Sequence, residues 1–281
     1  MATLITLKRR IRTARNVSKT TKAMQMISAS KLKRAQERAV ASKPYVERLE
    51  IISKNLSHKI DNIEQSDYMK KPDVNAKLIV VMSPDKGLCG GLITNLTREV
   101  LRADSGKLYF ITVGKKAESI VTSTGKDLIA SFPFGSSLPL YDTVYPIQNI
   151  IDEYFLGKKV SEVQIITTKF VSVFSQNVQN TTLLPINIEM EQKSSGVTLF
   201  EPVVDEILPD ILQHYIEMLI YQNLLESYAS EQAARMIAMK NATDNALDII
   251  DALQLEYNKT RQEKITNELL DIGGGLQKAY A

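Results

Sequence analysis

Apolar and small residues at alternating spacings of three and four run through the last quarter of the chain. The pattern begins at Leu208 and holds for fifteen positions to Tyr257, and the stretch 227–270 contains neither Pro nor Gly. This spacing aligns the side chains along one stripe of an α-helix, and a repeat of 3.5 residues is typical of a left-handed coiled coil. Such a stripe needs a partner helix. Its positions are Leu208, Ile211, Tyr215, Met218, Gln222, Leu225, Ala229, Gln232, Met236, Met239, Thr243, Ala246, Ile250, Leu253 and Tyr257.

The first residues of the chain carry the same pattern over fourteen positions. We therefore predict two coiled-coil helices, 1–60 and 208–281, that pair as a rod. A helix from Thr3 to Lys59 would be roughly 85 Å long at about 1.5 Å per residue. Pro44 does not break the spacing, so a kinked but continuous helix is expected. The positions are Leu4, Leu7, Ile11, Ala14, Ser18, Thr21, Gln25, Ser28, Leu32, Ala35, Ala39, Ser42, Val46 and Leu49.

The two predicted helices differ in charge. Residues 1–59 hold fifteen Lys and Arg against three Glu, whereas residues 205–281 hold six basic and thirteen acidic side chains. Opposite charge favours pairing of one helix with the other, although an exposed ion pair contributes only about 0.3–0.5 kcal/mol. The basic face is either a solvated surface or a surface for an acidic protein or nucleic acid. No aromatic residue precedes Tyr45, which weakens the nucleic-acid reading.

The composition is that of a globular protein of one or two domains. It is 44% hydrophobic and 24% charged, with no apolar run long enough to span a membrane. The first residues lack the apolar core of a signal peptide, so a cytosolic protein is expected. The single Cys89 permits no internal disulfide and favours a packing role. His58 and His214 lie far apart in the sequence, which makes a metal site improbable.

Strand and helix patterns alternate between the two coiled-coil segments. Residues 61–76 are polar and form a predicted linker, residues 77–195 a central domain, and residues 196–207 a foot that connects to the second long helix. The alternation predicts a three-layer, Rossmann-like α/β domain with a largely parallel sheet, inserted between the helices of the rod. The predicted strands are 77–82, 108–114, 128–132, 163–170 and 181–188, and the predicted helices are 92–103, 115–124 and 147–157.

The turn at residues 83–91, SPDKGLCGG, resembles a phosphate-binding loop only superficially. Its glycines do not fit G-x-G-x-x-G, and Lys86 precedes them, whereas the lysine of a P-loop follows them. A structural turn is therefore favoured, and the residues alone reveal no active site. Two other functions stay open at this stage: a nucleotide-binding α/β enzyme and a basic coiled-coil protein that binds nucleic acid.

Four segments together resemble one family, the gamma subunits of rotary F-type ATP synthases. They are TKAMQMISASKLKRAQ (21–36), DKGLCGGL (85–92), SYASEQAARMIAMKNATDNA (227–246) and YNKTRQEKITNELLDI (257–272). The resemblance implies an antiparallel coiled coil inside a ring of three alpha and three beta subunits, with the α/β domain outside. It further implies a rotor shaft without catalysis or cofactor of its own, which couples proton flow through a membrane c-ring to ATP synthesis on beta subunits.

The resemblance also implies contact residues. Lys22, Met24 and Arg235 are expected to meet acidic lever loops of beta subunits, and Arg261, Gln262 and Thr266 to form a polar catch further along the shaft. The segment 200–208 is expected to contact the c-ring and an epsilon subunit. Neither nucleic acid nor membrane insertion is implied. The expected location is peripheral, on the cytoplasmic face of a bacterial cell membrane. Three glycines at 273–275 are expected to interrupt the end of the last helix.

Overall fold

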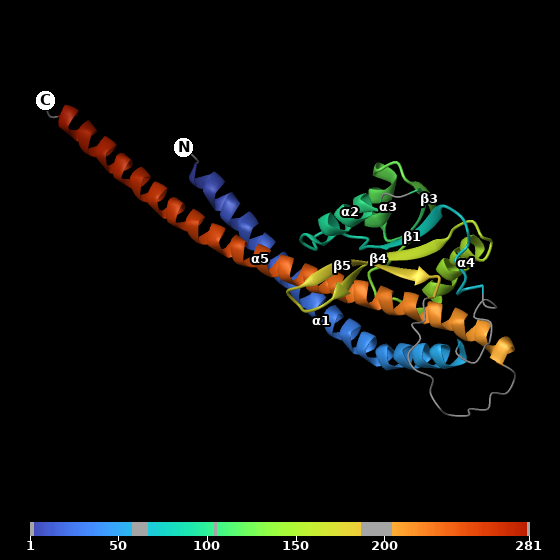
Figure 1. Cartoon of the computed structure of the whole chain (residues 1–281). Helices are drawn as coiled ribbons and strands as arrows, with labels where there is room; N and C mark the ends of the chain where they lie inside the picture. Colours follow the sequence, from blue (N-terminus) through green and yellow to red (C-terminus); the bar gives the residue numbers. More distant parts are fainter. Residues whose placement is uncertain (1–2, 58–66, 104–105, 187–203, 280–281) are drawn as a thin grey trace. The chain divides into compact units, whose positions relative to one another are not determined.

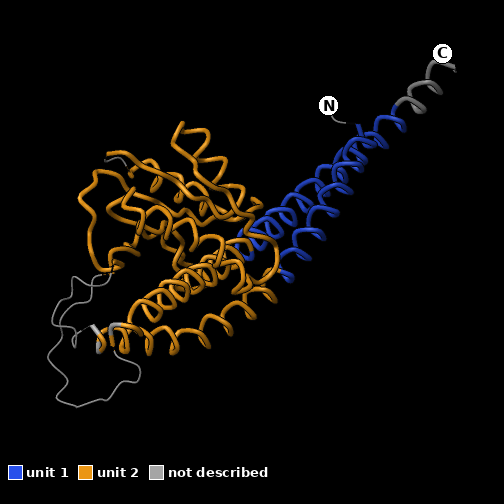
Figure 2. The backbone as a smooth tube through the Cα atoms, turned by 90° about the vertical axis from the view of Figure 1, so that its right-hand side faces the viewer, with its two compact units in different colours: residues 1–27, 236–281 blue, residues 28–235 orange. Residues whose placement is uncertain are grey.

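The computed structural model describes residues 3–57, 67–103, 106–186 and 204–279. The chain divides into two compact units, which Figure 2 shows in different colours. Unit 1 comprises residues 1–27 and 236–281, and unit 2 comprises residues 28–235. Two long helices, α1 (Leu4–Ser57) and α5 (Val204–Ala279), contribute to both units.

Unit 1 is an antiparallel pair of helices, formed by the beginning of α1 and the end of α5 (Figure 1). Leu7 and Ile11 are buried on α1, and Met239 is buried on α5. The hydroxyl groups of Thr21 and Thr243 lie 2.7 Å apart across the pair and share a hydrogen bond. The predicted coiled coil is therefore confirmed in this unit.

In unit 2 the two helices again pack along the predicted stripes. Val46 of α1 forms a small core with Met218 of α5, and Ser42 Oγ donates a hydrogen bond of 2.5 Å to Gln222 Oε1. α1 continues through Pro44, as expected. All predicted stripe positions of both helices are buried or half-buried. In neither unit, however, does an ion pair of described residues join α1 to α5.

Unit 2 also contains a five-stranded sheet in the order β3-β2-β1-β4-β5. The first four strands are parallel, which confirms the predicted largely parallel sheet, and β5 pairs antiparallel with β4. The five residues between β4 and β5 allow only a hairpin connection, because parallel neighbours need a long crossover. The strands are β1 (Ala76–Met82), β2 (Lys107–Val113), β3 (Asp127–Phe132), β4 (Glu162–Phe170) and β5 (Gln176–Leu184).

Helices cover both faces of the sheet. On one face α2 (Leu92–Arg102) and α3 (Lys115–Ser123) share a core with Ile79 and Phe110, and Ala234 of α5 joins it. The residue before Phe110, Tyr109, points to the other face and makes an edge contact with Tyr154 of α4 (Val144–Phe155). A short 3-10 helix, η2 (Tyr141–Thr143), precedes α4. The predicted three layers are therefore confirmed.

Some predictions concern residues outside the described part. Residues 61–66 of the predicted linker and residues 196–203 of the predicted foot lie there. The expectation that the glycines at 273–275 interrupt the last helix is wrong, because α5 continues to Ala279. Gly lowers helix stability by only about 1 kcal/mol per residue relative to Ala, so a few glycines do not have to end a long helix.

Candidate partner interface

Five of the six residues implied by the resemblance lie on the helix pair of unit 1. Lys22 is exposed on α1, and Met24 is half-buried one turn from Thr21. On α5, Arg261, Gln262 and Thr266 are exposed, and Thr266 Oγ1 bonds only to the carbonyl of Gln262 within the same helix. These side chains are free to meet another molecule.

The structure separates these five residues into two groups. Thr21 of α1 lies opposite Thr243 of α5, which sets the level of Lys22 and Met24 on the helix pair. Arg261 follows Thr243 by eighteen residues, so it lies roughly 27 Å further along α5 at about 1.5 Å per residue. The five residues therefore fall into two groups at different levels of the helix pair.

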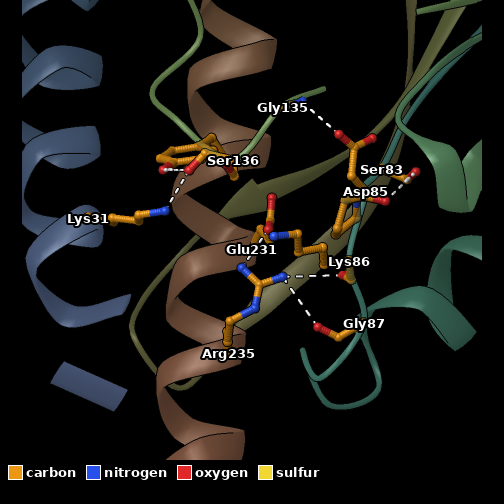
Figure 3. A network of polar contacts seen from close by, with 11 residues as sticks. Lys31, Ser83, Asp85, Lys86, Gly87, Gly135, Ser136, Glu231 and Arg235 are labelled. Atoms are coloured by element: carbon orange, nitrogen blue, oxygen red, sulfur yellow. Dashed lines mark hydrogen bonds and ion pairs between the residues drawn. The ribbon is translucent and has the colours of Figure 1, made fainter. Parts of the chain in front are cut away.

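Arg235 has a different environment, because its partners lie within the chain. Only 11% of its side chain is exposed, and Nη1 lies 2.5 Å from Glu231 Oε1 on the same face of α5. Its second nitrogen, Nη2, donates to the backbone carbonyls of Lys86 and Gly87 at 3.2 and 3.3 Å (Figure 3). Arg235 thus fastens α5 to the turn that follows β1.

The turn itself is held by the carboxylate of Asp85. This group accepts hydrogen bonds from the backbone N–H groups of Lys115, Phe134 and Gly135, at 2.9, 3.3 and 2.8 Å. Next to it, Ser83 Oγ accepts the N–H of Ala117 at 2.6 Å. The amides at the start of α3, where a phosphate could bind, therefore already have partners. This arrangement agrees with a structural turn.

Glu231 is the least solvated charged group of this cluster. Its side chain is only 5% exposed, and Oε2 is buried without a hydrogen-bond partner among the described residues. Burial raises the pKa of Glu231, and the nearby charge of Arg235 opposes this rise. The charges of Glu231 and Arg235 therefore depend strongly on each other, since neither side chain has much water around it.

A second set of contacts joins α1 and α5 to the loop after β3. Lys31 Nζ of α1 donates a 2.5 Å hydrogen bond to the carbonyl of Ser136, which also accepts the hydroxyl of Tyr228 of α5 at 3.3 Å (Figure 3). Burial raises the pKa of Tyr228 to about 12. Lys31, Asp85 and Glu231 were not identified from the sequence. Only the spacing of Glu231 and Arg235, four residues apart on a helix, was a visible signal.

Other kinds of site find no support in the described part of the chain. No three His, Cys, Asp or Glu residues cluster there as metal ligands. None of its helices has the length and apolar character needed to cross a bilayer. Cys89 is buried, and burial raises the pKa of its thiol, which disfavours the reactive thiolate.

Known proteins match this chain over nearly its whole length, and they belong to one family. The family model described as "ATP synthase" matches residues 3–278. The ATP synthase gamma chain of Dehalococcoides mccartyi strain CBDB1 is 39% identical over 280 residues, which cover 98% of both chains. The gamma chain of Verminephrobacter eiseniae is 37% identical over 281 residues, with 96% of both chains covered.

Solved structures show the same fold. A chain in the Euglena gracilis mitochondrial ATP synthase, in the structure of OSCP, F1 and c-ring, matches with a TM-score of 0.77 at 20% identity. The match covers 99% of this chain and 95% of that one. A chain in the central stalk and c-ring of the Tetrahymena thermophila enzyme is 26% identical, with a TM-score of 0.59 over 79% of this chain and 99% of that one.

Proposed function

Because the chain belongs to the ATP synthase gamma-chain family, we propose that it is the central shaft that couples proton flow through a membrane c-ring to ATP synthesis and hydrolysis. Unit 1 would stand inside a ring of three alpha and three beta subunits, and the ring would hold the catalytic sites. The chain would be a non-catalytic subunit that acts by its shape and charge. Its expected place is peripheral, on the cytoplasmic face of a bacterial membrane.

The asymmetry of unit 1 carries this proposal. Exposed cations such as Lys8 and Arg15 come from α1, and no acid occurs in residues 1–27. Exposed acids such as Asp248 and Asp251 come from the facing part of α5. A shaft with unlike sides cannot meet identical neighbours in the same way, so each neighbour would favour a different conformation. Turning the shaft would pass these preferences around the ring.

In unit 2, hydrogen bonds attach the sheet domain to both long helices. Arg235 and Lys31 tie α5 and α1 to loops of the sheet domain, so a rotation of that domain would be passed to both helices. Contacts with an epsilon subunit and with the c-ring are proposed for the segment 200–208, of which residues 200–203 lie outside the described part of the chain.

Two other functions agree less well with the geometry. A nucleotide-binding enzyme would use the turn at residues 83–91 as its phosphate loop, but Asp85 and Ser83 of this turn bind amides at the start of α3 instead. A nucleic-acid-binding coiled coil would leave the acidic side of α5 without a purpose. Neither alternative requires the sheet domain to be fastened to both helices.

The proposal is tested by Met24→Lys in the complete, membrane-reconstituted complex. Met24 is half-buried beside exposed Lys22, so a second cation there would strengthen a contact with acidic loops and hinder turning. We expect ATP hydrolysis to continue while proton pumping per ATP falls. Val40→Lys, at a 71% exposed position of α1, is the matched control. Equal pumping per ATP in both variants and the parent would contradict the interface role of Met24, and failure of the parent chain to assemble with alpha and beta subunits would overturn the shaft role.

A further inference from the structure

The carboxyl ends of β1 and β4 lie at the switch point of the sheet. From β1 the chain moves through α2 to β2, whereas it reaches β4, on the other side of β1, through α4 on the opposite face. Open α/β sheets bind their ligands outside the carboxyl ends of two such strands. The pairing of β1 with β4 ends at Val81 and Ile166. The end of β4 and the loops after β1, β3 and β4 (83–91, 133–140 and 171–175) form the switch-point edge.

A segment of α5 occupies the place of a ligand at this edge. Residues 227–234 are all buried, eight in succession, whereas no more than two consecutive residues are buried elsewhere in the described part of α5. Eight residues make more than two turns of helix, so this segment is enclosed on all sides. A coiled-coil stripe alone would bury only one side of it.

Two hydroxyl groups of the segment reach the switch-point edge. Ser230 Oγ donates a hydrogen bond of 2.9 Å to the carbonyl of Thr168, which lies beyond the last residue of β4 that pairs with β1. The hydroxyl of Tyr228 donates to the carbonyl of Ser136, in the loop after β3 (Figure 3). Ser230 is completely buried, and Tyr228 is 1% exposed. Both donors therefore act where water does not compete.

The guanidinium group of Arg235 reaches the third element. Its Nη2 donates to two backbone carbonyls in the loop after β1 (Figure 3). Ala234, the residue before it, belongs to the same core as Ile79 of β1 and Cys89 of that loop. Within nine residues, α5 thus contacts the loops after β1 and β3 and the end of β4.

All of these hydrogen bonds have the same direction. Among the described residues, each bond from the segment to the edge is donated by α5 to a backbone carbonyl. A phosphate group needs the opposite, because its oxygens accept hydrogen bonds from N–H groups. Nearby N–H groups, those of Lys115 and Gly135, are already bound by Asp85. The edge is therefore suited to a ligand that brings hydrogen-bond donors.

We propose that the switch-point edge is a binding site for a helix with donor side chains, and that residues 227–235 of α5 are its ligand. Tyr228, Ser230 and Arg235 are the recognised side chains. The sheet domain thus uses the place where open α/β sheets bind small molecules to hold a part of its own chain. Any other ligand would have to displace α5 first. The inference goes beyond the proposed shaft function, because it concerns the chain by itself.

Hydrogen exchange of the full chain tests the role of the donors. Tyr228→Phe and Ser230→Ala each remove one hydroxyl group and keep most of the side chain. We expect exchange to become roughly two- to tenfold faster in residues 133–140 for Tyr228→Phe and in residues 163–175 for Ser230→Ala. In the double variant, exchange should also become faster in residues 83–91. Neither substituted side chain is hydrogen-bonded to that loop, but the same helix segment holds it.

The double variant Tyr215→Phe with Asn223→Ala is the matched control. Tyr215 packs half-buried against the small core that includes Met218, and Asn223 Nδ2 donates to the carbonyl of Leu219 in the same helix. Because neither side chain is hydrogen-bonded to the switch-point edge, exchange in the three loops should match that of the parent. Equal acceleration in the control and in the test double variant would overturn the role of the donors, and so would unchanged exchange in the test variant.

A second measurement tests the chemical class of the ligand. Inorganic phosphate and ATP are titrated separately into the full parent chain, and exchange is followed in residues 83–91 and 163–175. We expect neither compound to slow exchange there, because α5 occupies the edge and its contacts are carbonyl acceptors. Saturable protection of both segments by ATP would overturn the helix as ligand and identify a nucleotide site. Neither measurement uses the alpha–beta ring, so the results do not depend on the shaft role.

Discussion

Replacement of Arg235 by Met should reveal how strongly α5 is fastened to the sheet domain. The substitution keeps the apolar bulk of the side chain but removes the guanidinium group, its 2.5 Å ion pair with Glu231 and its bonds to two carbonyls of the turn. Both side chains are nearly buried, at 11% and 5% exposure. Removal of one partner of a buried pair costs about 3–5 kcal/mol, because the other charge stays behind without compensation.

The double variant Arg235→Met with Glu231→Leu isolates the cause of this loss. If the cost comes from the stranded carboxylate, removal of both charges should restore most of the stability, since a buried ion pair can often be replaced by apolar residues at little cost. We expect the double variant to lie within about 1–2 kcal/mol of the parent, the remainder arising from the two carbonyls of the turn that lose a donor.

The pH dependence gives a second test of the same reasoning. Burial raises the pKa of Glu231, and loss of Arg235 should raise it further, because Arg235 favours the charged form. A carboxyl group whose folded-state pKa lies above its unfolded value binds more protons when folded. Stability therefore falls as pH rises from the ordinary Glu range towards the folded-state pKa. Arg235→Met should lose less stability relative to the parent at pH 5 than at pH 8.

The measurement combines urea unfolding, followed by circular dichroism, with hydrogen exchange of residues 83–91. The control is Lys264→Met, because Lys264 and Glu268 form an i, i+4 pair on α5 at 3.5 Å with 63% and 61% exposure. It should cost less than about 0.5 kcal/mol. The reasoning is refuted if Arg235→Met costs no more than Lys264→Met, or if the double variant is less stable than Arg235→Met alone.

Three further predictions concern the turn and the helix pair, and each is tested by urea unfolding. Gly114→Ala would place its Cβ against the backbone carbonyl of Ser83 at φ +106°, so it should lower the free energy of unfolding by more than about 2 kcal/mol. Gly125→Ala, at φ +67° with open space around it, should lower it by about 1–2 kcal/mol. Equal losses of stability in the two variants would contradict the clash. Asp85→Asn removes the charged acceptor of three N–H groups and should cost about 1.5–3 kcal/mol with faster exchange of those amides, and unchanged exchange would contradict this role. Thr243→Val should lower the free energy of unfolding by about 1 kcal/mol. The double variant with Thr21→Val should lower it by no more than this, because both hydroxyl groups of the shared hydrogen bond are then absent. Additive losses from the two substitutions would exclude the hydrogen bond.

The helical part of the fold was predictable because its signal is local. Alternating spacings of three and four from Leu4 to Leu49 and from Leu208 to Tyr257 specify one buried stripe on each helix, whatever the rest of the chain does. The absence of described ion pairs between α1 and α5 was not predictable from net charge. The stripe positions that face each other are neutral, and most charged residues of both helices lie beside the stripe and are exposed to water.

Non-local contacts limited the prediction elsewhere. The first half of β5, from Gln176, is polar and lies at the edge of the sheet, so it lacks the apolar alternation that marks a strand. Arg235 has the type and the place expected of an interface residue. Its burial depends on the turn at Lys86 and Gly87, which lies about 150 residues earlier in the chain and reaches α5 only in the folded domain. No pattern within α5 contains that information.

The polar contacts within the two stripes have a mechanical consequence. The Thr21–Thr243 contact in unit 1 and the Ser42–Gln222 contact in unit 2 are three heptads apart on both helices. Small and apolar residues alone would tolerate a shift of one helix by a heptad, since every seventh residue is similar. After such a shift, Thr21 would face Ile250 or Met236 and Gln222 would face Leu49 or Ala35, so both would lose their hydrogen-bond partner. These few hydroxyl and amide groups thus fix the register of α1 and α5 and oppose sliding of one helix along the other under torque.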